Sequence, residues 1–191
     1  MILNIAQYGN PILRKPGRKV DSITPEIQAM VDDMFETMHE AKGIGLAAQQ
    51  IGQAIRLTVI DITGVTDRAP TAKIDKKEVD PEELMPLVLI NPEVTGIAEE
   101  VAGPEGCLSF PEIYGDISRP EAVKVSALDK NGEKIEFECG GLLAKAIQHE
   151  TDHLKGILYI DRMSSETKQE LQPDLDTLQN QTKKELKKKD S

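Results

Sequence analysis

Residues 148–153 read Gln-His-Glu-Thr-Asp-His, and the rest of the chain is best interpreted outward from this stretch. It lies in a segment of helical character over residues 142–155. Four residues make slightly more than one helical turn, so His149 and His153 project from the same face and can bind one metal ion. Glu150 is turned about 100° away, within reach of a water molecule at the metal without being a ligand. Two surface histidines on an amphipathic helix would give the same pattern.

A catalytic metal site with two histidines needs a third ligand and an open position. Tyr159 stands where one large group of proteases carries a third histidine, and Glu166 and Glu170 lie in a polar segment that we expect to be exposed. The better candidate is Cys107, in Gly103-Pro-Glu-Gly-Cys-Leu-Ser109, because the glycine before it lets the loop aim a thiolate inward. A set of one cysteine and two histidines suits Fe(II) or Zn(II).

A third segment, Gly43-Ile-Gly-Leu-Ala-Ala-Gln-Gln50, follows the first long helix that we expect. Closely spaced glycines bring backbone near a ligand, and a glutamine amide is a neutral donor for a developing oxyanion. A tight helix-to-strand turn explains the glycines equally well.

The remaining pattern predicts one α+β domain, with mixed or antiparallel β-sheets packed around a central metal-binding helix and a C-terminal helix. Thr24-Pro25-Glu26 is typical of a helix start, and an apolar stripe follows it at helical spacing to about residue 42. Asn131-Gly132 predicts the turn of a β-hairpin. We expect a polar surface insertion over residues 64–86, strands over 57–61, 87–90, 123–128, 134–139 and 157–160, and a polar helix over 164–189.

Composition limits the chemistry that this chain can carry. Its 191 residues include only two Cys and three His, which excludes multi-zinc arrays, disulfide scaffolds and multihaem chains. Cys139 alternates with acidic residues in a strand and is expected to be a small buried hydrophobe, and His39 is expected on the surface. The net charge of −10 argues against a general nucleic-acid binder. No secretory signal or membrane-spanning run is visible, so we expect a soluble cytoplasmic protein with reduced cysteines and no contact with membranes.

Together the three segments, 43–50, 105–109 and 148–153, resemble the signature motifs of the peptide deformylases, in the order and approximate spacing of that family. The similarity extends over residues 1–165, which we expect to form the catalytic domain, with 166–191 as a polar C-terminal helix and basic tail. The resemblance implies a metal-dependent hydrolase that removes the N-formyl group from the initiator methionine of newly synthesised polypeptides and releases formate.

The resemblance also implies a role for individual residues. Cys107, His149 and His153 would bind the metal, usually Fe(II) with Zn(II) or Ni(II) as substitutes, and Glu150 would be the catalytic acid and base. Gln50 and the Leu108 backbone N–H would stabilise the oxyanion. Gly45 would hold the substrate backbone as an added strand. The substrate-binding residues that it implies are Ile44, Gly45, Leu46, Glu105, Gly106, Leu142 and Ala146.

Two residues depart from the family pattern. Lys145 lies one turn before His149, where an apolar residue near the methionine pocket is common. Either its stem lines the wall while its amine reaches water, or it alters the side-chain preference. Tyr114 stands where some members have an arginine that assists peptide binding. Residues 181–191 carry five Lys against two acidic residues; they are either a solvated, frayed helix end or a contact for ribosomal RNA, without sequence-specific nucleic-acid recognition.

Two other functions stay open at this stage. A metalloprotease would share the histidines and Glu150 but explains neither Cys107 nor Gln50. The non-enzymatic alternative is a structural metal site or a ribosome-associated binding module. A closed fourth ligand would support it, and Cys139 is the only spare sulfur. The strand pattern buries Cys139 away from residues 148–153.

Overall fold

The computed structural model describes all 191 residues and contains a large and a small β-sheet with three α-helices. No helix is both long and apolar enough to cross a lipid bilayer. The strands are β1 (Gly45–Ala47), β2 (Leu57–Ile60), β3 (Thr71–Ile74), β4 (Lys77–Val79), β5 (Leu87–Gly96), β6 (Glu100–Cys107), β7 (Phe110–Pro120), β8 (Ala122–Leu128) and β9 (Lys134–Gly140). The α-helices are α1 (Pro25–Glu40), α2 (Gly141–His153) and α3 (Ser165–Lys189), and four short 3-10 helices are η1 (Pro11–Arg14), η2 (Ala48–Ile51), η3 (Pro81–Leu84) and η4 (Tyr159–Arg162).

The large sheet is antiparallel and has the strand order β1-β2-β5-β8-β9-β3-β4. The β8–β9 hairpin agrees with the expected one, and Gly132 has the positive φ of 83° that its turn requires. Strand β1 stands at one edge of the sheet, so one side of its backbone has no neighbouring strand. Residues 43–45 lead into this free edge, because Gly45 is the first residue of β1.

The polar stretch over residues 64–86 is more than a surface insertion. Its strands β3 and β4 extend the large sheet beyond β9, and Ala72 is buried in the core. The two strands show only one buried residue, Ala72, so their sequence lacks the alternation by which a strand is recognised.

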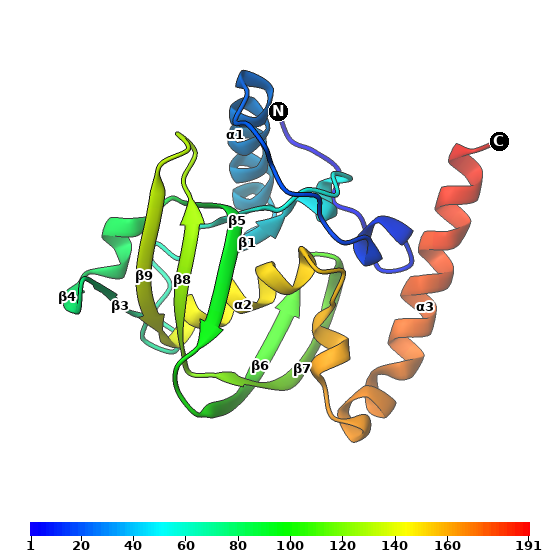
Figure 1. Cartoon of the computed structure of the whole chain (residues 1–191). Coiled ribbons are helices and arrows are strands. Elements are labelled where there is room, and N and C mark those ends of the chain that lie inside the picture. The colour runs from blue at the N-terminus through cyan, green and yellow to red at the C-terminus, as the bar shows by residue number, and fades with distance from the viewer.

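Helix α2 is the centre of the structure, between the large sheet and the β6–β7 hairpin (Figure 1). Leu143, Ala144 and Ile147 have no exposed surface and pack with the inward-facing side chains of β2, β5, β8 and β9. Its first residue, Gly141, has φ 63°, and a Cβ there would lie 2.2 Å from the Ala69 carbonyl oxygen. The helix therefore begins where the chain can pass close to residues 68–69.

The other two α-helices lie at the periphery, α1 at the top of the view and α3 along its right-hand edge (Figure 1). In α1, Thr24 caps the first turn by accepting the Ile27 N–H at 3.3 Å, and Val31, Met34 and Met38 are buried in the core, as the apolar stripe predicts. In α3, Leu175 is buried against the β6–β7 side of the molecule, while most of the helix faces solvent.

One predicted element is wrong: residues 157–160 form no strand. The chain instead turns into η4, where the Asp161 carboxylate accepts the Leu158 N–H at 3.0 Å. Tyr159 and Ile160 are buried in a third apolar cluster with residues of β7 and α3. Their apolar character reflects this packing and not a position in a sheet.

Candidate active site

Helix α2 and strand β6 bring together three side chains that could hold a metal ion. One ligand atom from each of Cys107, His149 and His153 lies within 4.8 Å of the other two, and the Cys107 Sγ is 3.5 Å from the His153 Nε2. A tetrahedral ion at about 2.0–2.3 Å from nitrogen and sulfur ligands needs a spacing of this kind. Burial, and then the neighbouring His149, lowers the pKa of His153. Burial also acts to lower the pKa of His149, but its contacts with Cys107 and Glu105 outweigh burial and raise it. These residues fit a metal ion with mixed sulfur and nitrogen ligands.

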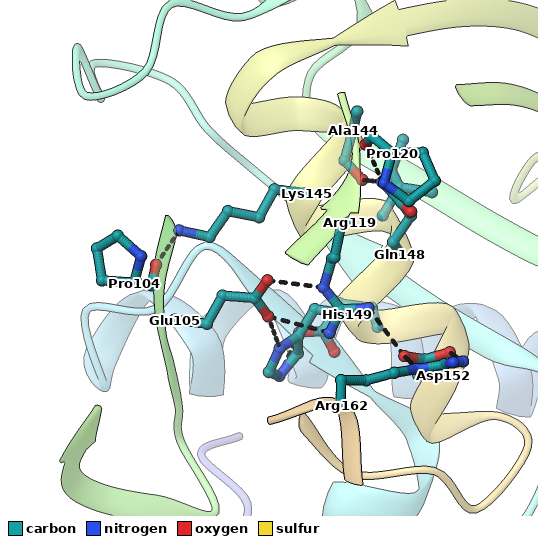
Figure 2. A network of polar contacts seen from close by, with 12 residues as sticks. Pro104, Glu105, Arg119, Pro120, Ala144, Lys145, Gln148, His149, Asp152 and Arg162 are labelled. Atoms are coloured by element: carbon teal, nitrogen blue, oxygen red, sulfur yellow. Dashed lines mark hydrogen bonds and ion pairs between the residues drawn. The ribbon is translucent and has the colours of Figure 1, made fainter. Parts of the chain in front are cut away.

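The outer nitrogen of His149 is held by a buried ionic network (Figure 2). Its Nδ1 lies 2.9 Å from the Glu105 Oε1, and Arg119 donates to both oxygens of Glu105 at 2.6 and 3.0 Å. Arg119 also donates to Asp152 at 2.9 Å, and Arg162 donates twice to the same carboxylate, at 3.0 and 3.2 Å. Carboxylate bonding to the outer nitrogen of a ligand histidine fixes the ring and its tautomer.

The network explains the protonation state of Glu105. Burial acts to raise the pKa of this carboxyl group, but the hydrogen bonds from His149 and Arg119 outweigh it and hold the pKa at about 2. Two carboxylates and two guanidinium groups make the network electrically balanced, although most of it is buried.

Glu150 is buried beside His149, with one oxygen available for chemistry. Its Oε1 lies 4.0 Å from the His149 Nε2, and its Oε2 is buried without a hydrogen-bond partner. Burial raises the pKa of Glu150 to about 7. A carboxyl group with a pKa near neutrality can both take up and release a proton at physiological pH.

Gln50 is fully buried and its amide has a fixed orientation. The Ala47 N–H donates to its Oε1 at 2.9 Å, which turns its Nε2 toward the Ser109 Oγ at 3.1 Å and the Cys107 Sγ at 3.6 Å. The donor end of the amide therefore lies beside Cys107, one of the three residues that could hold a metal ion. The Leu108 N–H, one residue after Cys107, donates to no protein group.

The glycines of the first motif make room for residues of the other two. A Cβ on Gly45 would lie 2.8 Å from the Cγ and Oε1 of Glu150, and a Cβ on Gly43 would lie 2.7 Å from the Leu108 side chain. Real Cβ atoms do not approach other heavy atoms within 3.0 Å. The 43–45 backbone can therefore lie directly against Glu150 and Leu108.

Several of these groups line one open cavity of about 560 Å³, whereas Gln50 and His153 do not line it. Cys107, Leu108, His149 and Glu150 line it together with Ile44, Gly45, Glu105, Gly106, Lys145 and Ala146. Two expected substrate-binding residues do not line the cavity: Leu46 is fully buried in the cluster around α1, and Leu142 packs in the core between α2 and the large sheet.

The two departures from the family pattern lie at the cavity wall. The Lys145 amine donates to the Pro104 carbonyl oxygen, as Figure 2 shows, so its charge is directed to the β6 backbone. Tyr114 is 65% exposed, and its ring covers Gly106 so closely that a Cβ there would lie 2.5 Å from its Cε1.

The other candidate ligands lie elsewhere. Cys139 is buried in β9, where burial raises the pKa of its thiol to about 12, and it belongs to the core between α2 and the large sheet. Tyr159 donates its hydroxyl to the Ile113 carbonyl oxygen at 2.6 Å. His39 is exposed and pairs with Asp61 at 3.0 Å.

The sequence interpretation missed Arg119 and Arg162, and it gave Asp152 no role. A single arginine ahead of a proline in a strand carries no mark of burial. Asp152 had one signal, because it lies between the two histidines on a helix whose other residues are mostly apolar.

Comparisons with known proteins show which proteins this chain resembles in sequence and in fold. The family model described as polypeptide deformylase matches residues 2–169. A peptide deformylase of Methylacidiphilum infernorum is 44% identical over 93% of each chain, and one of Opitutus terrae is 42% identical over 93% of each chain. The crystal structure of a peptide deformylase from Legionella pneumophila is similar with a TM-score of 0.77, at 36% identity over 94% of this chain and 96% of that one. One from Ehrlichia chaffeensis gives 0.81, at 32% identity over 97% and 99%.

Proposed function

The chain belongs to the polypeptide deformylase family, and from this premise we propose a role for each residue of the site. It is a hydrolase that removes the N-formyl group from nascent peptides in a metal-dependent reaction. The observation that carries the assignment to residues is the convergence of Cys107, His149 and His153 within 4.8 Å beside the buried carboxylate of Glu150.

Cys107, His149 and His153 bind the metal ion in this proposal. We propose Fe(II) as the natural ion, with Zn(II) and Ni(II) as substitutes, because a thiolate with two imidazoles suits all three. When bound, the ion supplies Lewis-acid activation of water and of the formyl group. Glu105 keeps His149 oriented for binding through the 2.9 Å contact at Nδ1.

Glu150 moves the proton. Its unpartnered Oε2 accepts a proton from the attacking water as the oxygen of that water adds to the formyl carbon. The same carboxyl group then delivers the proton to the departing amine, and the carbon–nitrogen bond breaks to give formate and the free N-terminus. The raised pKa of about 7 suits both steps.

Gln50 and Leu108 stabilise the negative charge that develops on the formyl oxygen. The Gln50 Nε2 is aimed at the metal ligands by the bond from Ala47 to its Oε1. The Leu108 N–H has no competing acceptor in the protein. Loss of one such donor costs roughly 3–4 kcal/mol of transition-state stabilisation in comparable sites.

The substrate lies along the free edge of β1. Because β1 is an edge strand of the large sheet, an extended peptide can pair with the backbone at Gly45. The first side chain of the peptide would then enter the cavity and contact Ile44, from the 43–45 segment, and Ala146, from α2. Such a site fits N-formyl-methionyl peptides as they leave the ribosome.

Cellular context adds two further proposals. We propose a cytoplasmic enzyme whose catalytic unit spans residues 1–165, with residues 166–191, which include most of α3, as an accessory C-terminal segment. The five lysines of residues 181–191 lie near the solvent-exposed end of α3 and would contact ribosomal RNA. Deletion of 181–191 should reduce co-sedimentation with ribosomes at low salt, and unchanged binding would reject this contact.

The residue roles are tested by anaerobic purification, metal analysis and formate release from formyl-Met-Ala-Ser. Glu150→Ala should keep the metal and lose at least 100-fold in kcat; substantial turnover would reject its role as acid and base. Cys107→Ser should weaken metal binding at least tenfold. Cys139→Ser is the matched control, because this thiol is buried in β9 outside the cavity, and it should keep the metal.

A further inference from the structure

The N-terminal residues 6–8 join the two halves of the oxyanion-binding site. The Ala6 N–H donates to the Gln50 carbonyl oxygen at 2.7 Å, and the Tyr8 N–H donates to the Ser109 carbonyl oxygen at 3.0 Å. Between them, the Gln7 Nε2 donates to the Leu108 carbonyl oxygen at 3.1 Å. In Figure 1 this blue segment passes beside the cyan turn that carries Gln50.

Only one of these three bonds depends on a side chain. Ala6 and Tyr8 act through backbone N–H groups, which nearly every residue type could supply. Gln7 acts through its amide, and that amide also donates to the Ile5 carbonyl oxygen at 3.1 Å, which fixes where its nitrogen lies. An aliphatic side chain or a carboxylate at position 7 could not donate to Leu108.

The Leu108 backbone needs such a restraint. Leu108 lies in the turn between β6 and β7, outside the hydrogen-bonded register of both strands. Its N–H is free of protein acceptors, so the sheet does not fix the direction of that bond. The carbonyl oxygen of the same residue is held by Gln7, and holding one end of the residue limits rotation of the other.

We propose that Gln7 is a positioning residue for the oxyanion contact, because its amide holds the Leu108 backbone so that the Leu108 N–H points at the formyl oxygen. This inference rests on the proposed roles of Gln50 and Leu108. A misplacement of about 1 Å costs about 100-fold in rate, and the Tyr8–Ser109 bond would still limit the movement. We therefore expect loss of the Gln7 amide to lower kcat roughly tenfold.

The test compares Gln7→Met, which keeps the length without the amide, with Gln7→Glu, which keeps the shape without a donor. Both should lower kcat for formyl-Met-Ala-Ser roughly tenfold. KM and the inhibition constant of the product Met-Ala-Ser should stay within twofold, because the product has no formyl oxygen. Thermal unfolding and metal content are measured for each variant.

Gln49→Met is the matched control. Gln49 is fully buried in the same turn as Gln50, and its amide donates to the Lys15 carbonyl oxygen at 3.2 Å, away from Leu108. This variant loses a comparable buried amide bond but should keep kcat within twofold. It separates a general loss of packing from a loss of alignment.

The outcomes separate this inference from the proposed function. If Gln50→Ala lowers kcat about 100-fold while both Gln7 variants keep wild-type kcat, the inference is overturned and the oxyanion assignment stands. If Gln50→Ala has no effect, the oxyanion assignment itself fails. A fall in kcat for the Gln7 variants that is matched by equal losses of product affinity or bound metal would show a general structural role and would also overturn the inference.

Discussion

Replacing Glu105 by glutamine would test how much the buried ionic network around the His149 ring contributes to stability and to metal binding. The Glu105 carboxylate receives two bonds from Arg119 and one contact from His149, and its side chain is only 2% exposed. Glutamine has nearly the same shape but only one accepting oxygen. Its NH2 group would face donors of Arg119 or His149.

The expected magnitude follows from what remains around Arg119. With Glu105 neutral, this buried guanidinium keeps only Asp152, which it shares with Arg162. Removing one partner of a buried ion pair costs about 3–5 kcal/mol. For a chain of this length each kcal/mol lowers Tm by about 2–4 °C, so we expect Tm to fall by roughly 10 °C. Freed from its carboxylate, His149 should bind metal about 10–100-fold more weakly.

The assay separates these two effects. Thermal unfolding of the metal-free protein, followed by circular dichroism, measures the network alone, and competition with a chelator measures metal affinity. Glu136→Gln is the control, because its partner Lys134 lies 3.2 Å away on an exposed strand face, and it should change stability by less than about 0.5 kcal/mol. A Glu105→Gln variant with Tm within 2 °C of wild type and unaltered metal affinity would refute the reasoning.

Three further predictions concern the core, the pH dependence and the cavity wall. Leu143→Ala, at a side chain with no exposed surface, should lower the free energy of unfolding by about 3–5 kcal/mol in guanidinium titrations. Asp161→Asn should lower the free energy of unfolding by about 1 kcal/mol near pH 7, because Arg14 and a backbone N–H outweigh burial and lower the pKa of Asp161 in the folded state. The stabilisation by the ionised carboxylate is present above pH 3.8 and is lost as the pH falls through the lowered pKa. The free energies of unfolding of the variant and the wild type should therefore converge in acid. Lys145→Met should leave the preference for formyl-Met over formyl-norleucine peptides within threefold, because the amine is engaged by Pro104; a tenfold change in relative kcat/KM would instead assign Lys145 to substrate selection.

The sequence predicted the elements whose pattern is local. The stripe of α1, the hairpin turn at Asn131-Gly132 and the long polar α3 all follow from spacing and capping that a single segment contains. Strands β6 and β7 were not predicted, because glycines and prolines interrupt the residue pattern by which a strand is recognised. The two strands pair only with each other, in a separate small sheet.

The sequence indicated which residues converge at the candidate site but not the ionic network that surrounds them. The spacing of His149 and His153 indicated a metal pair, and the glycines of 43–50 indicated a close backbone approach. The side chains that approach these glycines are those of Glu150 and Leu108. Glu150 is about 100 residues away from them in the sequence, so the sequence could not identify it as the neighbour. Arg119 could not be assigned because its partners, Glu105 and Asp152, become neighbours only through folding.

The close approach of Glu150 to Gly45 has a practical consequence for redesign of the cavity. The two positions share one space, so an engineer who adds a methyl group at 45 must shorten the acid at the same time, for instance as the pair G45A with E150D. Tyr114 and Gly106 form a second such pair. A library that varies the two members of each pair jointly can move the Glu150 carboxylate while the space between the paired positions stays filled.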